Sequence, residues 1–155
     1  MKGFISALIV ITMTGLLFSA RAQTPKTRAV AADTSFQQPL YTDYRGVKLG
    51  MTAQEVRAKL GNPVLKDDEL DYFVFSDSVS GQIAYDSSHK VKAISVDYAS
   101  GVGAPDYRTV IGPEITTRAD GSIYGIVRYE SLGFWVSYNR TAGPVVIVTI
   151  TIQRT

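Results

Sequence analysis

The chain has 155 residues, with 16 Lys and Arg, 14 Asp and Glu, one His and no Cys, a length typical of one domain or of two very small ones. The absence of cysteine excludes disulfides, thiolate metal sites and cysteine nucleophiles. The single histidine, His89, excludes a metal site built from several histidines, and we expect neither a metal nor a cofactor.

Residues 1–22 have the pattern of a secretory signal peptide. Lys2 precedes an uncharged apolar run over residues 4–18, and the small residues Ala20 and Ala22 follow it. The alternative is a membrane anchor, but this run is shorter than the roughly 20 residues that span a bilayer. We therefore expect cleavage after Ala22 and export, to the periplasm or outside the cell, with peripheral attachment at the outer membrane left open.

The remaining chain is electrically balanced. Cleavage would remove Lys2 and Arg21 and leave 133 residues with 14 basic and 14 acidic side chains, which gives no long-range field to attract nucleic acid. The apolar residues 145–152 are too few to span a membrane, so no transmembrane segment is expected after cleavage. Residues 23–43 lack any apolar period and are predicted to be a flexible linker before a domain over residues 44–155.

The first predicted element is a short helix over residues 52–60. Thr52 and Glu55 have the spacing of a capping box, in which each side chain accepts a hydrogen bond from the backbone of the other. Val56 and Leu60 lie four residues apart and form the buried stripe. Gly61 followed by Pro63 ends the helix.

Three antiparallel strands are expected to follow, over residues 71–76, 81–86 and 91–98, with a polar hairpin turn between the last two. In the third of these strands Ile94, Val96 and Tyr98 alternate with smaller or polar residues. That alternation is typical of a sheet with one covered face and one face open to water.

The second part of the chain repeats this order. A short helix is predicted over residues 104–111, with Pro105 in its first turn, and three strands are predicted over residues 122–129, 132–138 and 145–153. Three positions are similar between the two parts at offsets of 51 to 53 residues: Leu60-Gly61 with Ile111-Gly112, Val74 with Val127, and Tyr85-Asp86 with Tyr138-Asn139. The sequence therefore predicts an α+β fold of short helices on antiparallel sheet, with two half-repeats, 44–100 and 101–155, left as an open interpretation.

A family resemblance rests on residues 47–63. Leu-Gly-Met-Thr at residues 49–52 opens the predicted helix, and Leu-Gly-Asn-Pro at residues 60–63 closes it. This stretch resembles the signature of the BamE/SmpA/OmlA family, and the tandem order is similar to the β-lactamase-inhibitor-protein fold. The resemblance implies an outer-membrane accessory protein that contacts other assembly proteins. Because the chain lacks the family's lipidated cysteine and the matched residues are structural, no binding site is transferred.

Candidate catalytic groups are sparse. His89 lies in the predicted hairpin turn beside Ser88, and adjacent turn residues rarely reach the geometry that a base and a nucleophile require. Asp67, Asp68, Glu69 and Asp71 form an acidic run that lacks the spacing of a calcium loop, so we interpret it as a solvated loop. No enzymatic activity is expected, and a hydrolase that uses two carboxylates is the least favoured hypothesis.

The aromatic residues give the one candidate binding surface. Strand alternation assigns a core position to Leu132, Phe134, Val136 and Tyr138. The opposite face then carries the candidate partner-binding residues Tyr124, Arg128, Trp135, Ser137 and Thr149. Aromatic and Arg side chains on a wet sheet face are typical of an interface centre, although the other half of the protein could instead cover this face.

The favoured hypothesis is a non-catalytic binding module of the bacterial cell envelope whose partner is another envelope protein. It would bind through an open sheet face or a sheet edge, and a homodimer would also fit such a surface. The alternative is an inhibitor of an extracytoplasmic enzyme, with residues 75–80 or 128–131 as the inserted loop.

Overall fold

The computed structural model describes residues 38–155, so the predicted signal peptide lies outside the described residues. In this part of the chain the helices are α1 (Ala53–Leu60), α2 (Tyr107–Ile111) and the 3-10 turn η2 (Glu130–Leu132). The strands are β1 (Leu65–Lys66), β2 (Leu70–Ser76), β3 (Val79–Tyr85), β4 (Val91–Ala99), β5 (Ile123–Tyr129), β6 (Phe134–Arg140) and β7 (Ile147–Arg154).

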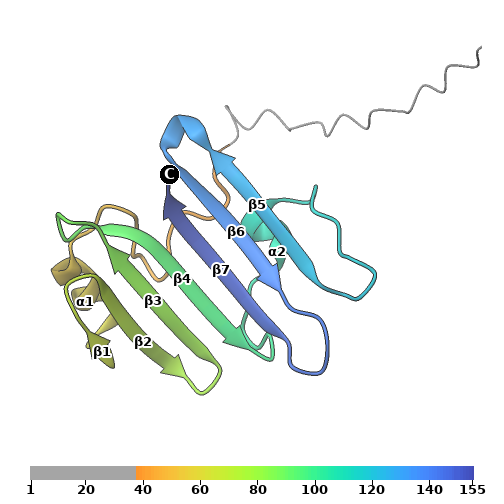
Figure 1. Ribbon diagram of the computed structural model, residues 1–155, viewed down its shortest axis with the longest axis horizontal. Coiled ribbons are helices and arrows are strands. Elements are labelled where there is room, and N and C mark those ends of the chain that lie inside the picture. Colours follow the sequence, from red (N-terminus) through yellow and green to blue (C-terminus); the bar gives the residue numbers. More distant parts are fainter. Residues whose placement is uncertain (1–37) are drawn as a thin grey trace, which may run out of the picture. The chain divides into compact units, whose positions relative to one another are not determined.

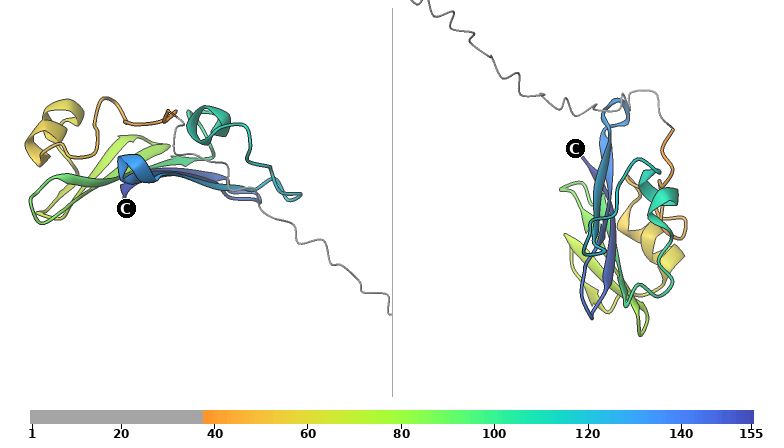
Figure 2. Two further views of the ribbon diagram at one scale, coloured as in Figure 1. Left: turned by 90° about the horizontal axis from the view of Figure 1, so that it is seen from above. Right: turned by 90° about the vertical axis from the view of Figure 1, so that its right-hand side faces the viewer.

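All seven strands form one antiparallel sheet in the order β1-β2-β3-β4-β7-β6-β5 (Figure 1). Both helices lie on the same face of this sheet (Figure 2). The predicted α+β fold is confirmed. The first half contributes α1 followed by the meander β1–β4, and the second half contributes α2 followed by the meander β5–β7. The two meanders join where β4 pairs with β7.

The capping box that was predicted at the start of α1 is present. The Thr52 side chain accepts from the Glu55 amide at 3.3 Å, and the Glu55 carboxylate accepts from the Thr52 amide at 2.8 Å. The hydrogen bonds that the Glu55 carboxylate accepts from the Thr52 amide and hydroxyl hold the pKa of Glu55 below its ordinary value. Gly61 and Gly112 end the two helices with the same positive φ of 88°, a conformation that residues with a Cβ rarely adopt.

The core lies between the helices and the sheet. Alternate residues of the central strands fill it, with Ile94, Val96 and Tyr98 of β4 buried as predicted. Val136 and Tyr138 of β6 are buried too, but Leu132 is 57% exposed. Leu132 leaves the core because residues 130–132 form a 3-10 turn, which delays the start of β6 to Phe134.

Several predicted boundaries are wrong. The second helix begins at Tyr107 because Asp106 caps it by accepting from the Arg108 amide at 2.8 Å. Strand β7 begins at Ile147, two residues after the predicted start, and the short strand β1 was not predicted. The proposed match of Val74 with Val127 fails, because Val74 lies on the open face while Val127 packs against the core.

The predicted linker over residues 23–43 extends too far. Tyr41 packs against the core. Burial raises the pKa of Tyr41. The folded domain therefore includes residues that precede Tyr44.

Asp71 corrects the interpretation of the acidic run. Asp67, Asp68 and Glu69 are exposed, whereas Asp71 is fully buried because it is the second residue of β2 and points toward α1. Its carboxylate accepts from Arg57 Nε at 2.8 Å, from Arg57 Nη2 at 2.9 Å and from the Tyr85 hydroxyl at 2.8 Å. The two hydrogen bonds from Arg57 attach α1 to the sheet, and the one from Tyr85 links β3 to β2 at the same carboxylate.

We expect Asp71→Ala to reduce the free energy of unfolding by about 3 kcal/mol. The substitution breaks the buried ion pair and leaves Arg57 and Tyr85 without their hydrogen-bond acceptor. Tyr85→Phe should cost about 1–2 kcal/mol, since it removes one of the three hydrogen bonds. Urea unfolding followed by far-UV circular dichroism measures both. The matched control is Asp68→Ala, an exposed neighbour that should stay within about 0.5 kcal/mol of wild type; equal losses at Asp68 and Asp71 would contradict this account.

Candidate partner-binding surface

The open face of the sheet is the candidate surface. The described helices lie on the opposite face, so within residues 38–155 no helix covers it (Figure 2). Strand pairing brings residues from distant parts of the chain into continuous rows. One row crosses all seven strands and contains Ile126, Ser137, Thr151, Ser95, Gln82, Tyr72 and Leu65. A parallel row contains Tyr124, Asn139, Thr149, Asp97, Ser80 and Val74.

All five residues predicted for this face lie on it. Arg128 is paired directly with Trp135, and Ser137 lies two residues further along β6. Tyr124 and Thr149 share the parallel row, separated by one strand. The structure therefore brings Arg128, Trp135 and Ser137 together at the β5–β6 end, while Tyr124 lies about 13 Å further along β5 than Arg128.

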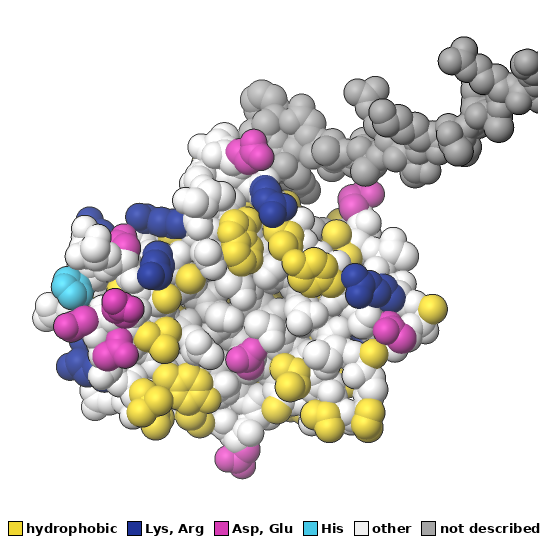
Figure 3. All heavy atoms as spheres, viewed as in Figure 1, with side chains coloured by type: hydrophobic (Ala, Val, Ile, Leu, Met, Phe, Trp, Pro, Cys, Tyr) yellow, Lys and Arg dark blue, Asp and Glu magenta, His cyan; other side chains and the backbone are white. Residues whose placement is uncertain are grey.

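The two rings differ in exposure. Tyr124 is 53% exposed, and Trp135 is half-buried between Arg128 of β5 and Gln153 of β7. Neither ring enters the core. Hydrophobic side chains on this face form separate groups among polar atoms (Figure 3).

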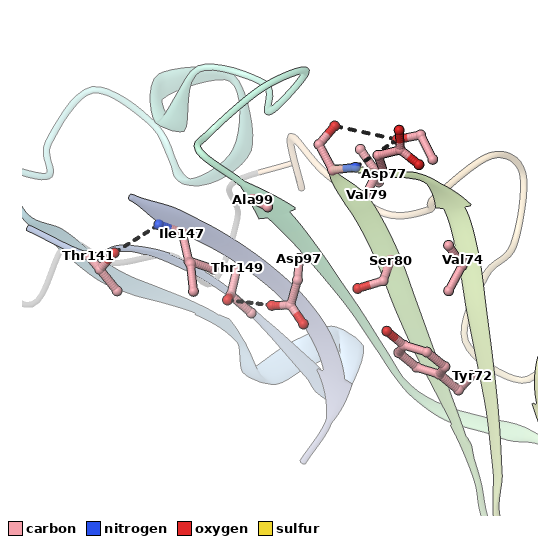
Figure 4. A pocket seen from close by; sticks show the side chains of 12 residues that line it. Tyr72, Val74, Asp77, Val79, Ser80, Asp97, Ala99, Thr141, Ile147 and Thr149 are labelled. Carbon is pink, nitrogen blue, oxygen red and sulfur yellow. Dashed lines mark hydrogen bonds between the residues drawn. The ribbon is translucent and has the colours of Figure 1, made fainter. Parts of the chain in front are cut away.

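A shallow groove of about 510 Å³ crosses the same face between the β2–β3 hairpin and β7. Figure 4 shows the Tyr72 ring lying along the sheet beside Ser80, with Asp97 and Thr149 in the floor. The Thr149 hydroxyl donates to Asp97 Oδ1 at 2.6 Å. In the neighbouring row the Ser95 and Thr151 hydroxyls are 3.1 Å apart. The floor thus holds a hydroxyl and a carboxylate joined by a hydrogen bond across the β4–β7 pair, and a similar hydroxyl pair lies beside it.

The groove was missed by the sequence analysis. Alternation with Ile94, Val96 and Tyr98 places the polar residues between them, Asp97 included, on the open face, but nothing local in the sequence shows that β4 and β7 pair. That pairing places Asp97 opposite Thr149, 52 residues later. Only Thr149 belongs both to the predicted set and to the groove.

The remaining candidate groups lie apart from this surface. His89 is exposed, with a φ of 54°, in the β3–β4 turn, where its amide donates to the Asp86 carbonyl at 2.8 Å. The pKa of Asp86 is lowered by the hydrogen bond from the Lys90 amide and by a second one from Ser88. In the described part of the chain no three His, Cys, Asp or Glu side chains form a group that could hold a metal ion.

Comparisons with known proteins give a limited result. No family model and no curated protein matches the chain. Among solved structures, a DUF4309 family protein (YjgB) from Bacillus subtilis is similar with a TM-score of 0.48 and 13% sequence identity, over 79% of this chain and 91% of that chain. Within residues 38–155 no helix has the length and apolar character required to cross a membrane.

Because Tyr124 and Tyr129 lie on opposite faces of β5, we expect their replacement to lower the free energy of unfolding by different amounts. Tyr124→Ala should lower the free energy of unfolding by less than about 1 kcal/mol, since only cross-strand contacts on the open face are lost. Tyr129→Ala, in the same strand, should cost about 3–5 kcal/mol because its ring is buried in the core. Thermal unfolding followed by circular dichroism measures the difference, and similar costs would show that the open face is covered.

Proposed function

We propose that the chain is a non-catalytic protein-binding module of the bacterial cell envelope, whose open sheet face binds another envelope protein. The single observation that carries this proposal is the pairing of Trp135 with Arg128 on a face that the described helices leave uncovered. The resemblance of residues 47–63 to the BamE/SmpA/OmlA signature supports a role similar to that of outer-membrane assembly accessory proteins.

The chemistry of the face suits a protein partner. Trp, Tyr and Arg side chains combine apolar area with a polar group and dominate binding energy at interfaces. Around Trp135 and Tyr124 the neighbouring positions carry Ser, Thr, Asn and Gln side chains, which can exchange hydrogen bonds with water for hydrogen bonds with a partner. A central aromatic anchor with a polar rim is the usual anatomy of such a surface.

The cellular location is part of this proposal and is supported by the sequence of residues 1–22. Processing after Ala22 would release a chain that begins at Gln23. The released chain would be periplasmic or secreted, with attachment at the outer membrane through its partner.

The inhibitor alternative gains no specific support. Its two candidate loops are short connections. Strands β2 and β3 are joined by Asp77 and Ser78 alone, and β5 and β6 by residues 130–133, which begin with η2. An inhibitor of the proposed kind needs a loop long enough to enter an active site.

Binding can be measured with the envelope fraction of the bacterium that produces the protein. We expect wild type to capture a specific partner, and Trp135→Ala to weaken that binding by about 2 kcal/mol, or roughly 30-fold in Kd. Arg128→Ala should also weaken binding, because Arg128 is the direct neighbour of Trp135. Capture followed by titration of the purified partner gives both values.

The matched control is Val64→Ala, which removes an apolar side chain that is 64% exposed and lies outside the β5–β6 region. It should bind like wild type. If Val64→Ala and Trp135→Ala bind equally well, the interface lies elsewhere; if no partner is captured by folded wild type, the proposed function is wrong.

Export is tested separately. The full-length chain, produced in a bacterium, should be recovered from the periplasm or the medium with Gln23 as its first residue, because the small residues at 20 and 22 fit the signal-peptidase site. Mass spectrometry of the purified protein decides this. Recovery of the unprocessed chain in the cytoplasm would contradict the proposed location.

A further inference from the structure

The two edges of the sheet differ in their ability to accept another strand. At one edge, β1 contains only Leu65 and Lys66 and follows shortly after Pro63, and such short, charged edges resist pairing. At the other edge, β5 has seven residues and no proline or lysine. Among the described residues, no backbone hydrogen bond joins the outer side of β5 to another segment.

The chain already contains a joint of the kind that β5 could make. Strands β4 and β7 are the terminal strands of the two meanders, and they pair antiparallel over seven residues, from Ala93 with Gln153 to Ala99 with Ile147. Across this joint both helices stay on the same face of the sheet (Figures 1 and 2). An antiparallel pairing of two identical edge strands about a two-fold axis perpendicular to the sheet repeats that arrangement.

We infer that β5 pairs with β5 of a second copy of this chain, antiparallel and centred on Ile126, to form a continuous sheet of two chains. The register follows from geometry. Paired residues must lie on the same face, so a two-fold axis must pass through a residue of β5. Only a centre at Ile126 pairs all seven residues of the strand.

The side chains in this register are complementary. On the open face, Ile126 meets Ile126 of the second copy, and Arg128 meets Tyr124 twice. An Arg beside a Tyr ring is a favourable cation–π pair. Arg128, the one charged residue of β5, does not face Arg128 of the second copy. On the helix-bearing face, Gly125 meets Val127 and Ile123 meets Tyr129, so no like charges face each other.

The register can be tested with disulfides because the chain has no cysteine. In purified, exported protein, Ile126→Cys should oxidise to a covalent dimer, since directly opposite residues have Cα atoms about 4.5–5.5 Å apart. A mixture of Tyr124→Cys and Arg128→Cys proteins should cross-link to each other. Tyr124→Cys alone should not, because its two copies would lie about 13 Å apart along the strands.

The association itself is measured by sedimentation equilibrium over a concentration series. Wild type should reach twice the chain mass, and Ile126→Lys should remain at the single-chain mass because two lysines would meet at the axis. The matched control, Val74→Lys on β2, should dimerise like wild type. The inference is overturned if wild type has the single-chain mass throughout, if Ile126→Lys dimerises equally, or if Tyr124→Cys alone cross-links as well as Ile126→Cys. No partner protein is present, so the result is independent of the proposed envelope partner.

Discussion

The pairing of β4 with β7 is the constraint on which the rest of this structure depends. It joins two helix-plus-meander halves into one sheet, and it creates the rows that cross the open face. Without it Asp97 and Thr149 would not meet, and the groove between the β2–β3 hairpin and β7 would have no floor. The joint also leaves β1 and β5 as the two outer strands, so the candidate surface and the free edge have the same origin.

The two helices are attached to the sheet by different kinds of contact. In the first half, Asp71 receives hydrogen bonds from Arg57 and Tyr85, which satisfy a carboxylate that has no contact with water. In the second half, Tyr138 instead packs its ring against Tyr107 of α2, and its hydroxyl donates to the Pro105 carbonyl. Tyr85 and Tyr138 are thus similar in sequence position and both buried, yet one anchors an ion pair and the other an aromatic contact.

Local signals in the sequence were enough for the fold class, the cap of α1 and the glycine that ends it, because capping and turn chemistry depend on residues a few positions apart. Alternation also assigned Tyr124 and Trp135 to the open face. What failed depends on distant partners or on one residue of register. Asp71 was assigned to a solvated loop as part of an acidic run, whereas its burial depends on Arg57, 14 residues earlier. Leu132 was assigned to the core by strand alternation, which the 3-10 turn interrupts. The groove needed the β4–β7 pairing, which no local pattern encodes.

The position of β7 has a consequence for fragments of the chain. This strand lies in the middle of the sheet, between β4 and β6, but it follows every other strand in the sequence. A fragment that ends just before Ile147 therefore contains β1–β4 and the β5–β6 hairpin without the strand that lies between them, and both β4 and β6 then have an unpaired side. The sheet is therefore complete only in the whole domain, although each half has its own helix.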